Sequence, residues 1–110
     1  MKLADLPPGI IDWNNLPETR QWGEVGEAIS RSREYGPLQL RQVDYRPGYI
    51  ADHWCNKGHI LFVLTGSLVI EHQDGRQFDL SAGMTWHVGD DVHPAHRVIC
   101  RDGARVFIVD

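Results

Sequence analysis

The sequence lacks the features that mark several large classes of protein. Its 110 residues include only two cysteines, and the longest uninterrupted apolar run, residues 60–64, is far too short to span a bilayer. The net charge is −4, the pI is near 5.8, and no five-residue window concentrates basic side chains. Because phosphate contacts need clustered Lys and Arg, this composition argues against nucleic-acid binding. We therefore expect no nucleic acid and no membrane among the partners.

The N-terminal sequence bears on the cellular compartment. The first ten residues, MKLADLPPGI, lack the apolar core of a secretory signal, so we expect a cytoplasmic protein. Thiols stay reduced there, which argues against a disulfide between Cys55 and Cys100. Cys100 lies in the alternating stretch RVICR, where a small buried thiol is the expected role. Only Cys55, which has histidine neighbours, supports a chemical hypothesis.

Short strand-like segments separated by turn residues fill most of the chain. Asp74-Gly75 and Asp102-Gly103 are two-residue hairpin signals, and the length suits one domain with a single core. Many short strands joined by tight turns predict an all-β fold, either a sandwich or a barrel. The expected strands cover residues 26–34, 38–46, 51–55, 59–64, 68–73, 77–80, 84–88, 96–101 and 104–109.

The N-terminal segment has a different composition. Its prolines forbid a continuous helix or ladder, and it also contains two tryptophans, Trp13 and Trp22. We expect an extended arm over residues 1–24, anchored by these tryptophans on the outside of the barrel or on a partner subunit. Residues 25–110 would form the barrel. The alternative is an ordinary N-terminal strand with loops.

Three metal-ligand residue types lie close together before the apolar run. His53, Cys55 and His59 follow the spacing H-x-C-x3-H, and in a strand His53 and Cys55 would share one face. Imidazole nitrogen and thiolate sulfur are good ligands for zinc and other late first-row metals. The spacing therefore predicts a metal site. A Cys55 nucleophile with a histidine base is the alternative, but it leaves the other histidines without a role.

The pattern H-x-C-x3-H-x6-G, ending at Gly66, resembles the first motif of the cupin superfamily, G-x5-H-x-H-x3–4-E-x6-G. In this resemblance Cys55 stands for the second histidine and His59 for the glutamate, and Gly48 lies one residue closer to the first ligand. The stretch from Ser81 to residue 96 resembles the second motif, which ends in a histidine after a proline-containing loop. It implies His96 as the fourth ligand, with His93 as the runner-up.

The segment ADHWCNKGHI, with an ending like ARVFIVD, is similar to the small group of DHCW motif cupin fold proteins. This resemblance implies a jelly roll, or double-stranded β-helix, over roughly residues 9–110, with a metal on its inner face and a homodimer as the assembly. The set of His53, Cys55, His59 and His96 keeps three imidazoles and one anion, as in the usual cupin set. A thiolate shifts the preference toward zinc or iron, with nickel or copper as further candidates.

Other residues near these motifs have simpler expected roles. Asp52 should face away from the ligands and orient His53 through a hydrogen bond. His72 and His87 are expected on the surface or in packing, although His72 shares parity with core residues and would then point into the barrel. Trp86 is expected to pack in the core.

The motifs do not specify a reaction, because one fold hosts many functions. One hypothesis is an enzyme acting on an unidentified small organic molecule. Either Arg41 or Gln42 would face its cup, and an inward Arg41 would favour carboxylates. The second hypothesis is a non-catalytic binding or sensor module with a structural metal, and the third is a metal-free cupin.

Overall fold

The structure is a computed structural model that describes residue 3 and residues 6–110. Within this range one short 3-10 helix, η1 (Trp13–Asn15), is followed only by strands, and no helix is long and apolar enough to cross a membrane. The all-β prediction is therefore confirmed. The strands are β1 (Thr19–Trp22), β2 (Glu27–Tyr35), β3 (Leu38–Tyr45), β4 (Tyr49–Ile50), β5 (His59–His72), β6 (Gln77–Ser81), β7 (Thr85–Val88), β8 (His96–Cys100) and β9 (Ala104–Val109).

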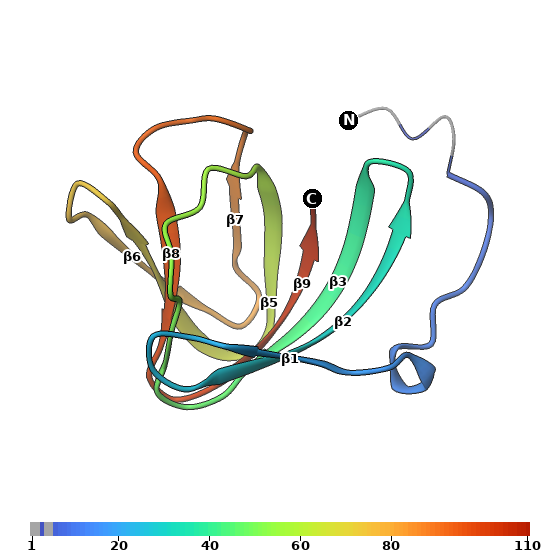
Figure 1. Ribbon diagram of the computed structural model, residues 1–110, viewed down its shortest axis with the longest axis horizontal. Coiled ribbons are helices and arrows are strands. Elements are labelled where there is room, and N and C mark those ends of the chain that lie inside the picture. Colours follow the sequence, from blue (N-terminus) through green and yellow to red (C-terminus); the bar gives the residue numbers. More distant parts are fainter. Residues whose placement is uncertain (1–2, 4–5) are drawn as a thin grey trace.

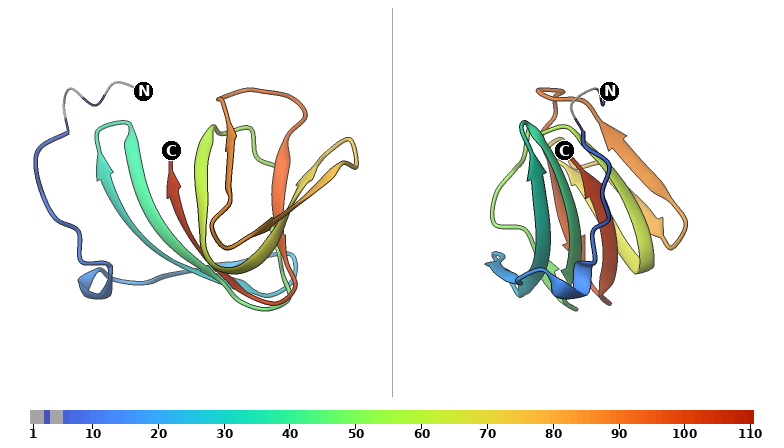
Figure 2. Two further views of the ribbon diagram at one scale, coloured as in Figure 1. Left: turned by 180° about the vertical axis from the view of Figure 1, so that it is seen from behind. Right: turned by 90° about the vertical axis from the view of Figure 1, so that its right-hand side faces the viewer.

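The strands form two antiparallel sheets that share the long strand β5. The first half of β5 pairs with β7 and β9, and β9 continues the sheet through β3 and β2 to β1. The second half of β5 pairs with β6 and β8, and β8 pairs with β4. Figure 1 shows the two sheets curling around a common interior, and Figure 2 shows the same curl from two other directions.

The core follows from the two-residue alternation along these strands. On β5, Leu61 and Val63 point inward, while Ile60 and Phe62 point outward and stay partly exposed. The inward residues meet those of β9, β3 and the second sheet in one cluster. Cys100 belongs to this cluster as a fully buried thiol, as expected from its alternating stretch.

Two predictions about the strands are wrong. Residues 51–55 do not form a strand, because the chain pairs with β8 only at Tyr49–Ile50 and touches it again at Cys55 through an isolated bridge to His96. Residues 59–64 and 68–73 form one continuous strand instead of two. Gly66 does not end the strand, because β5 passes from one sheet to the other there through an irregularity between Val63 and Thr65.

In the N-terminal segment, residues 6–18 run along the outside of the barrel (Figure 2), and residues 19–22 join the first sheet as β1. Trp13 packs edge-on against Phe107 of β9, with ring centroids 6.2 Å apart. Trp22, on β1, is exposed and has the guanidinium of Arg20 over its ring. Four residues of the arm, 1, 2, 4 and 5, lie outside the described part of the chain.

The bend at Gly66 yields a stability prediction with a matched control. Gly66 has φ +78°, and a Cβ there would lie 2.2 Å from the carbonyl oxygen of Gly103. Gly36 has a similar φ of +59°, but a Cβ there would meet no atom within 4 Å. We expect Gly36→Ala to cost about 1 kcal/mol of unfolding free energy, from the left-handed backbone alone. Gly66→Ala should cost about 3 kcal/mol or more, because the backbone must also move.

Urea unfolding of both variants measures the difference. Equal losses of unfolding free energy in the two variants would show that the close approach of Gly66 and Gly103 does not affect stability.

Candidate metal centre

A pair of backbone hydrogen bonds brings Cys55 to the barrel interior. Its N–H donates to the carbonyl of His96 (2.8 Å), and the N–H of His96 donates back to the carbonyl of Cys55 (3.0 Å). His96 begins β8 and His59 begins β5, and because β5 bends from one sheet into the other, the two imidazoles lie close together. The loop of residues 51–58 therefore delivers its thiol between two histidines that come from different sheets.

These three side chains form a group whose ligand atoms all lie within 4.8 Å of one another. The Sγ of Cys55 is 3.7 Å from Nε2 of His59, and the rings of His59 and His96 are 5.1 Å apart. His96 is 4% exposed, and neither of its ring nitrogens has a hydrogen-bond partner among the described residues. Buried nitrogens without partners are costly unless something else binds them.

The donor set fits a divalent metal. One thiolate and two imidazoles are ligands of zinc and other late first-row metals, and their spacing is short enough for a shared ion. An ion would also satisfy a nitrogen of His96 that the protein leaves unpaired. The structure therefore contains a possible divalent metal site formed by Cys55, His59 and His96.

The remaining expected ligand, His53, lies on the rim of this site. Its side chain is 63% exposed and lines the same cavity, but it is outside the three-residue group. Nδ1 of His53 donates to Oδ1 of Asp52 (2.6 Å), as expected for Asp52, and this hydrogen bond lowers the pKa of that carboxyl. Because the proton is held at Nδ1, Nε2 is free to bind a metal. The assignment of His53 as a ligand stays a prediction.

The other histidines are placed as follows. His93, the runner-up for the fourth ligand, is exposed and is not part of the three-residue group, whereas His96 is. His87 is exposed on β7. His72 packs between Phe78 and Trp86.

A buried carboxylate that the sequence analysis did not single out lies behind His59. Oδ2 of Asp110 is 2.9 Å from Nδ1 of His59 and accepts a hydrogen bond from Nη2 of Arg41 (2.7 Å), and the Asp110 side chain is 2% exposed. Burial alone would raise the pKa of Asp110, but its close contact with the ring of His59 and the charge of Arg41 lower it below its ordinary value. The ionised carboxylate favours a proton on Nδ1 of His59 and leaves Nε2 toward Cys55.

Asp110 could have been found from alternation. Val106 and Ile108 are the inward residues of β9, and Asp110 is the next position of the same parity. Alternation also decides which of Arg41 and Gln42 faces the interior of the barrel. Arg41 lines the cavity, in register with Ile108.

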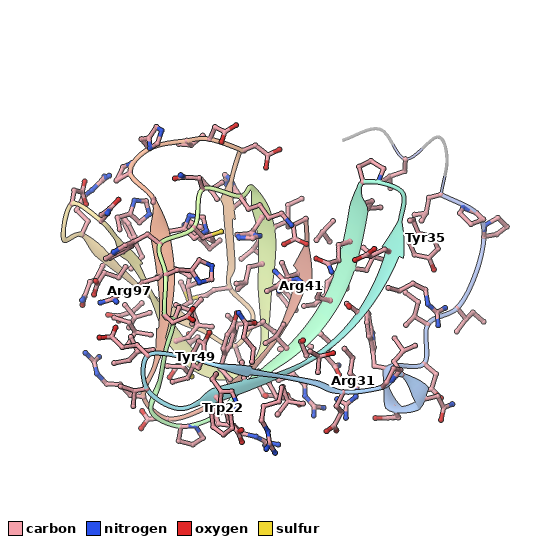
Figure 3. The ribbon with its side chains drawn as sticks, in the orientation of Figure 1. Trp22, Arg31, Tyr35, Arg41, Tyr49 and Arg97 are labelled. Atoms are coloured by element: carbon pink, nitrogen blue, oxygen red, sulfur yellow. The ribbon has the colours of Figure 1, made fainter. Side chains whose placement is uncertain are left out.

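The cavity beside the metal site has a volume of about 100 Å³. Arg41 reaches it from β3 (Figure 3). Arg97, on β8, lies at its edge, and its guanidinium is paired with Glu71 (3.1 Å) and Glu24 (3.3 Å). Arg97 also lies over the ring of Trp54, 4.5 Å from its centroid, which ties the loop of Cys55 to β8. A larger cavity, about 550 Å³, adjoins His59 and Asp110 on the side of the N-terminal arm.

Comparison with known proteins supplies the fold class. No protein-family model matches the chain, and no curated protein matches it. Solved structures do. A predicted oxalate decarboxylase from Thermotoga maritima aligns over 92% of this chain and 96% of its own, with a TM-score of 0.77 and 12% identity.

Two further structures agree. The polyketide cyclase RemF from Streptomyces resistomycificus aligns over 94% of this chain and 78% of its own, with a TM-score of 0.76 and 16% identity. A cupin-2 domain-containing protein from Shewanella frigidimarina aligns over 74% and 78%, with a TM-score of 0.59 and 19% identity. The chain therefore has the cupin fold, a jelly-roll barrel, as the motif resemblance implied.

The buried imidazole of His96 yields a pH prediction for the metal-free protein. Burial lowers the pKa of His96 from 6.5 to about 4, and the nearby His59 and His72 add to this shift. Between these pH values the unfolded chain holds more protons than the folded one, so stability falls as the pH falls. We expect a loss of up to about 3 kcal/mol of unfolding free energy from pH 6.5 to 4.

Urea unfolding of chelator-treated protein across this range measures the slope. His96→Gln should flatten it, and His87→Gln, at an exposed site, should leave it unchanged. An equal slope in the wild type and His96→Gln would contradict a buried, neutral His96.

Proposed function

We propose that this chain is a small metal-binding cupin that holds one divalent ion through Cys55, His59, His96 and His53. The observation that carries the proposal is the meeting of a thiol and two imidazoles from three separate segments within 4.8 Å. His53 would complete the set from the cavity rim, where its hydrogen bond to Asp52 leaves Nε2 available. Zinc or iron is the preferred ion, with nickel or copper as alternatives, because the thiolate is a soft donor.

The residues around this site favour a small anionic ligand. Arg41 lines the cavity, and its Nε has no hydrogen-bond partner among the described residues, whereas Glu71 and Glu24 already pair with the guanidinium of Arg97. Guanidinium groups bind carboxylates through paired hydrogen bonds. A volume of about 100 Å³ limits the ligand to a few non-hydrogen atoms. The likeness to a predicted oxalate decarboxylase agrees with a small carboxylate.

We further propose an enzymatic role, in which a bound ion would polarise a carbonyl or activate a water molecule. Arg41 would orient the anion, and the Asp110 carboxylate would keep the proton of His59 on Nδ1. The alternative is a binding or sensor module with a structural metal. The small cavity and the thiolate ligand support this alternative, since closed sites with sulfur ligands are typical of structural zinc.

Elemental analysis of freshly purified protein, followed by oxygen uptake after anaerobic Fe(II) loading, separates these roles. Iron-loaded protein that consumes oxygen with a small carboxylate and no added reductant supports the enzyme. Tightly held zinc with no exchangeable position supports the binding module. Protein that retains no divalent metal under any loading condition overturns the metal-binding proposal itself.

The two cysteines provide a matched test of the ligand assignment. Cys55→Ser should lower metal affinity by at least about tenfold, because a neutral hydroxyl replaces the anionic thiolate, while the barrel stays folded. Cys100→Ser should leave the metal content unchanged but lower the unfolding free energy by about 1–3 kcal/mol, because a hydroxyl replaces a fully buried thiol. Metal titration and urea unfolding of both variants measure the two effects.

Loss of folding in Cys55→Ser would instead show that the metal is required for the fold. Unchanged metal affinity in that variant would remove Cys55 from the ligand set.

We also propose that the protein is a cytoplasmic homodimer. Both cysteines are free thiols, which suits a reducing compartment. Three side chains in a row on the outer face of β5 are more than a third exposed, namely Ile60, Phe62 and Leu64, and a subunit contact would cover them. Light scattering should then give twice the 12.5 kDa chain mass. Phe62→Glu should shift the protein to monomer, and a wild-type monomer would contradict the proposal.

A further inference from the structure

A third cavity opens at the side of the barrel, and no predicted metal ligand lines it. It lies between β6 and β7, each of which is one edge strand of its sheet, since each pairs only with β5 among the described strands. Its volume is about 440 Å³, within the usual range of small-molecule sites. We call it the side slot, and its lining residues are His72, Gln77, Phe78, Asp79, Leu80, Met84 and Trp86.

The side slot exposes side chains from the interior face of the barrel. Phe78 pairs in register with the fully buried Ile70, so it points to the same face, yet Phe78 is 41% exposed. Met84, on the opposite lip of the slot, is 44% exposed. The two sheets therefore leave their interior uncovered here, and an apolar, aromatic surface faces the opening.

One polar group in this surface lacks a partner. Both ring nitrogens of His72 are shielded from solvent and have no hydrogen-bond partner among the described residues. The ring lies 5.1 Å from that of Phe78 and 6.4 Å from that of Trp86, both roughly perpendicular to it. Because Phe78 is exposed, a ligand that displaces its ring uncovers an imidazole able to donate or accept a hydrogen bond.

We propose that the side slot binds a small, flat aromatic molecule carrying a hydroxyl or carbonyl group. The aromatic ring would pack against Phe78, Met84 and Trp86, and the polar group would pair with His72. The site is separate from the metal cavity, because no predicted metal ligand lines it, so it does not rest on the proposed function. Trp86 forms a wall of both cavities, and its ring is 4.7 Å from that of His96.

Phenol is a suitable probe, because it has one aromatic ring and one hydroxyl. Titration of ¹⁵N-labelled full-length protein should shift the amide signals of Phe78 and Met84 and the indole N–H of Trp86, with a dissociation constant on the order of 1 mM. Toluene, which lacks the hydroxyl, and cyclohexanol, which lacks the aromatic ring, should each bind about tenfold more weakly. No saturable shift with phenol, or equal binding of all three probes, would overturn the proposal.

Two variants separate the two parts of the site. Phe78→Ala should weaken phenol binding, and His72→Phe, which keeps a ring but removes the nitrogens, should abolish the preference for phenol over toluene. Phe62→Ala, a similarly exposed phenylalanine on the outer face of β5, is the control and should bind phenol as the wild type does. If Phe78→Ala does not fold, Met84→Ala takes its place. A preference for phenol that survives in His72→Phe would overturn the assignment of His72.

Cys55→Ser distinguishes this site from the metal cavity. Phenol binding that persists in this variant supports a separate site, whatever becomes of the metal. Phenol binding that disappears with the metal would place the phenol on the ion and overturn the proposal.

Discussion

The two backbone hydrogen bonds between Cys55 and His96 are the contact on which the site depends. The loop of residues 51–58 is also held by the hydrogen bonds from Ala51 to Val98 and from Asp91 to Asn56, but only the pair with His96 fixes the backbone of Cys55 itself. Through that pair, a thiol from a loop reaches an imidazole at the start of β8, and His59 completes the group. The position of the chemical groups is therefore set by backbone pairing, which is strong and directional.

A buried ion-pair network then orients one side of the group. Asp110 is almost fully buried, and the positive charge of Arg41 and the ring nitrogen of His59 compensate for the cost of burying its charge. The same arginine faces the cavity, so one residue links the orientation of His59 to the charge that an incoming ligand meets. Arg41 and Asp110 thus orient His59 and also set the charge at the cavity.

The barrel is open in two unlike ways. At one end the cavity beside Cys55, His59 and His96 is small and combines these polar groups and Arg41 with apolar core residues, whereas the side slot between β6 and β7 is larger and lined mainly by aromatic and apolar groups. Trp86 lies between them and contacts His96 on one side and His72 on the other.

The sequence by itself determined the all-β class, most strand positions and the buried role of Cys100, because these depend on alternation and turn residues within short segments. It also predicted Cys55, His59 and His96 as metal ligands, from their spacing and from the resemblance to the cupin motifs. Only the tertiary structure decided that Cys55 lies in a loop and pairs with His96, 41 positions away (96 − 55). The tertiary structure alone also placed Asp110 beside His59 and left Phe78 exposed at the side slot. These features depend on which strands become neighbours and which remain edges, and local periodicity carries no information about that choice.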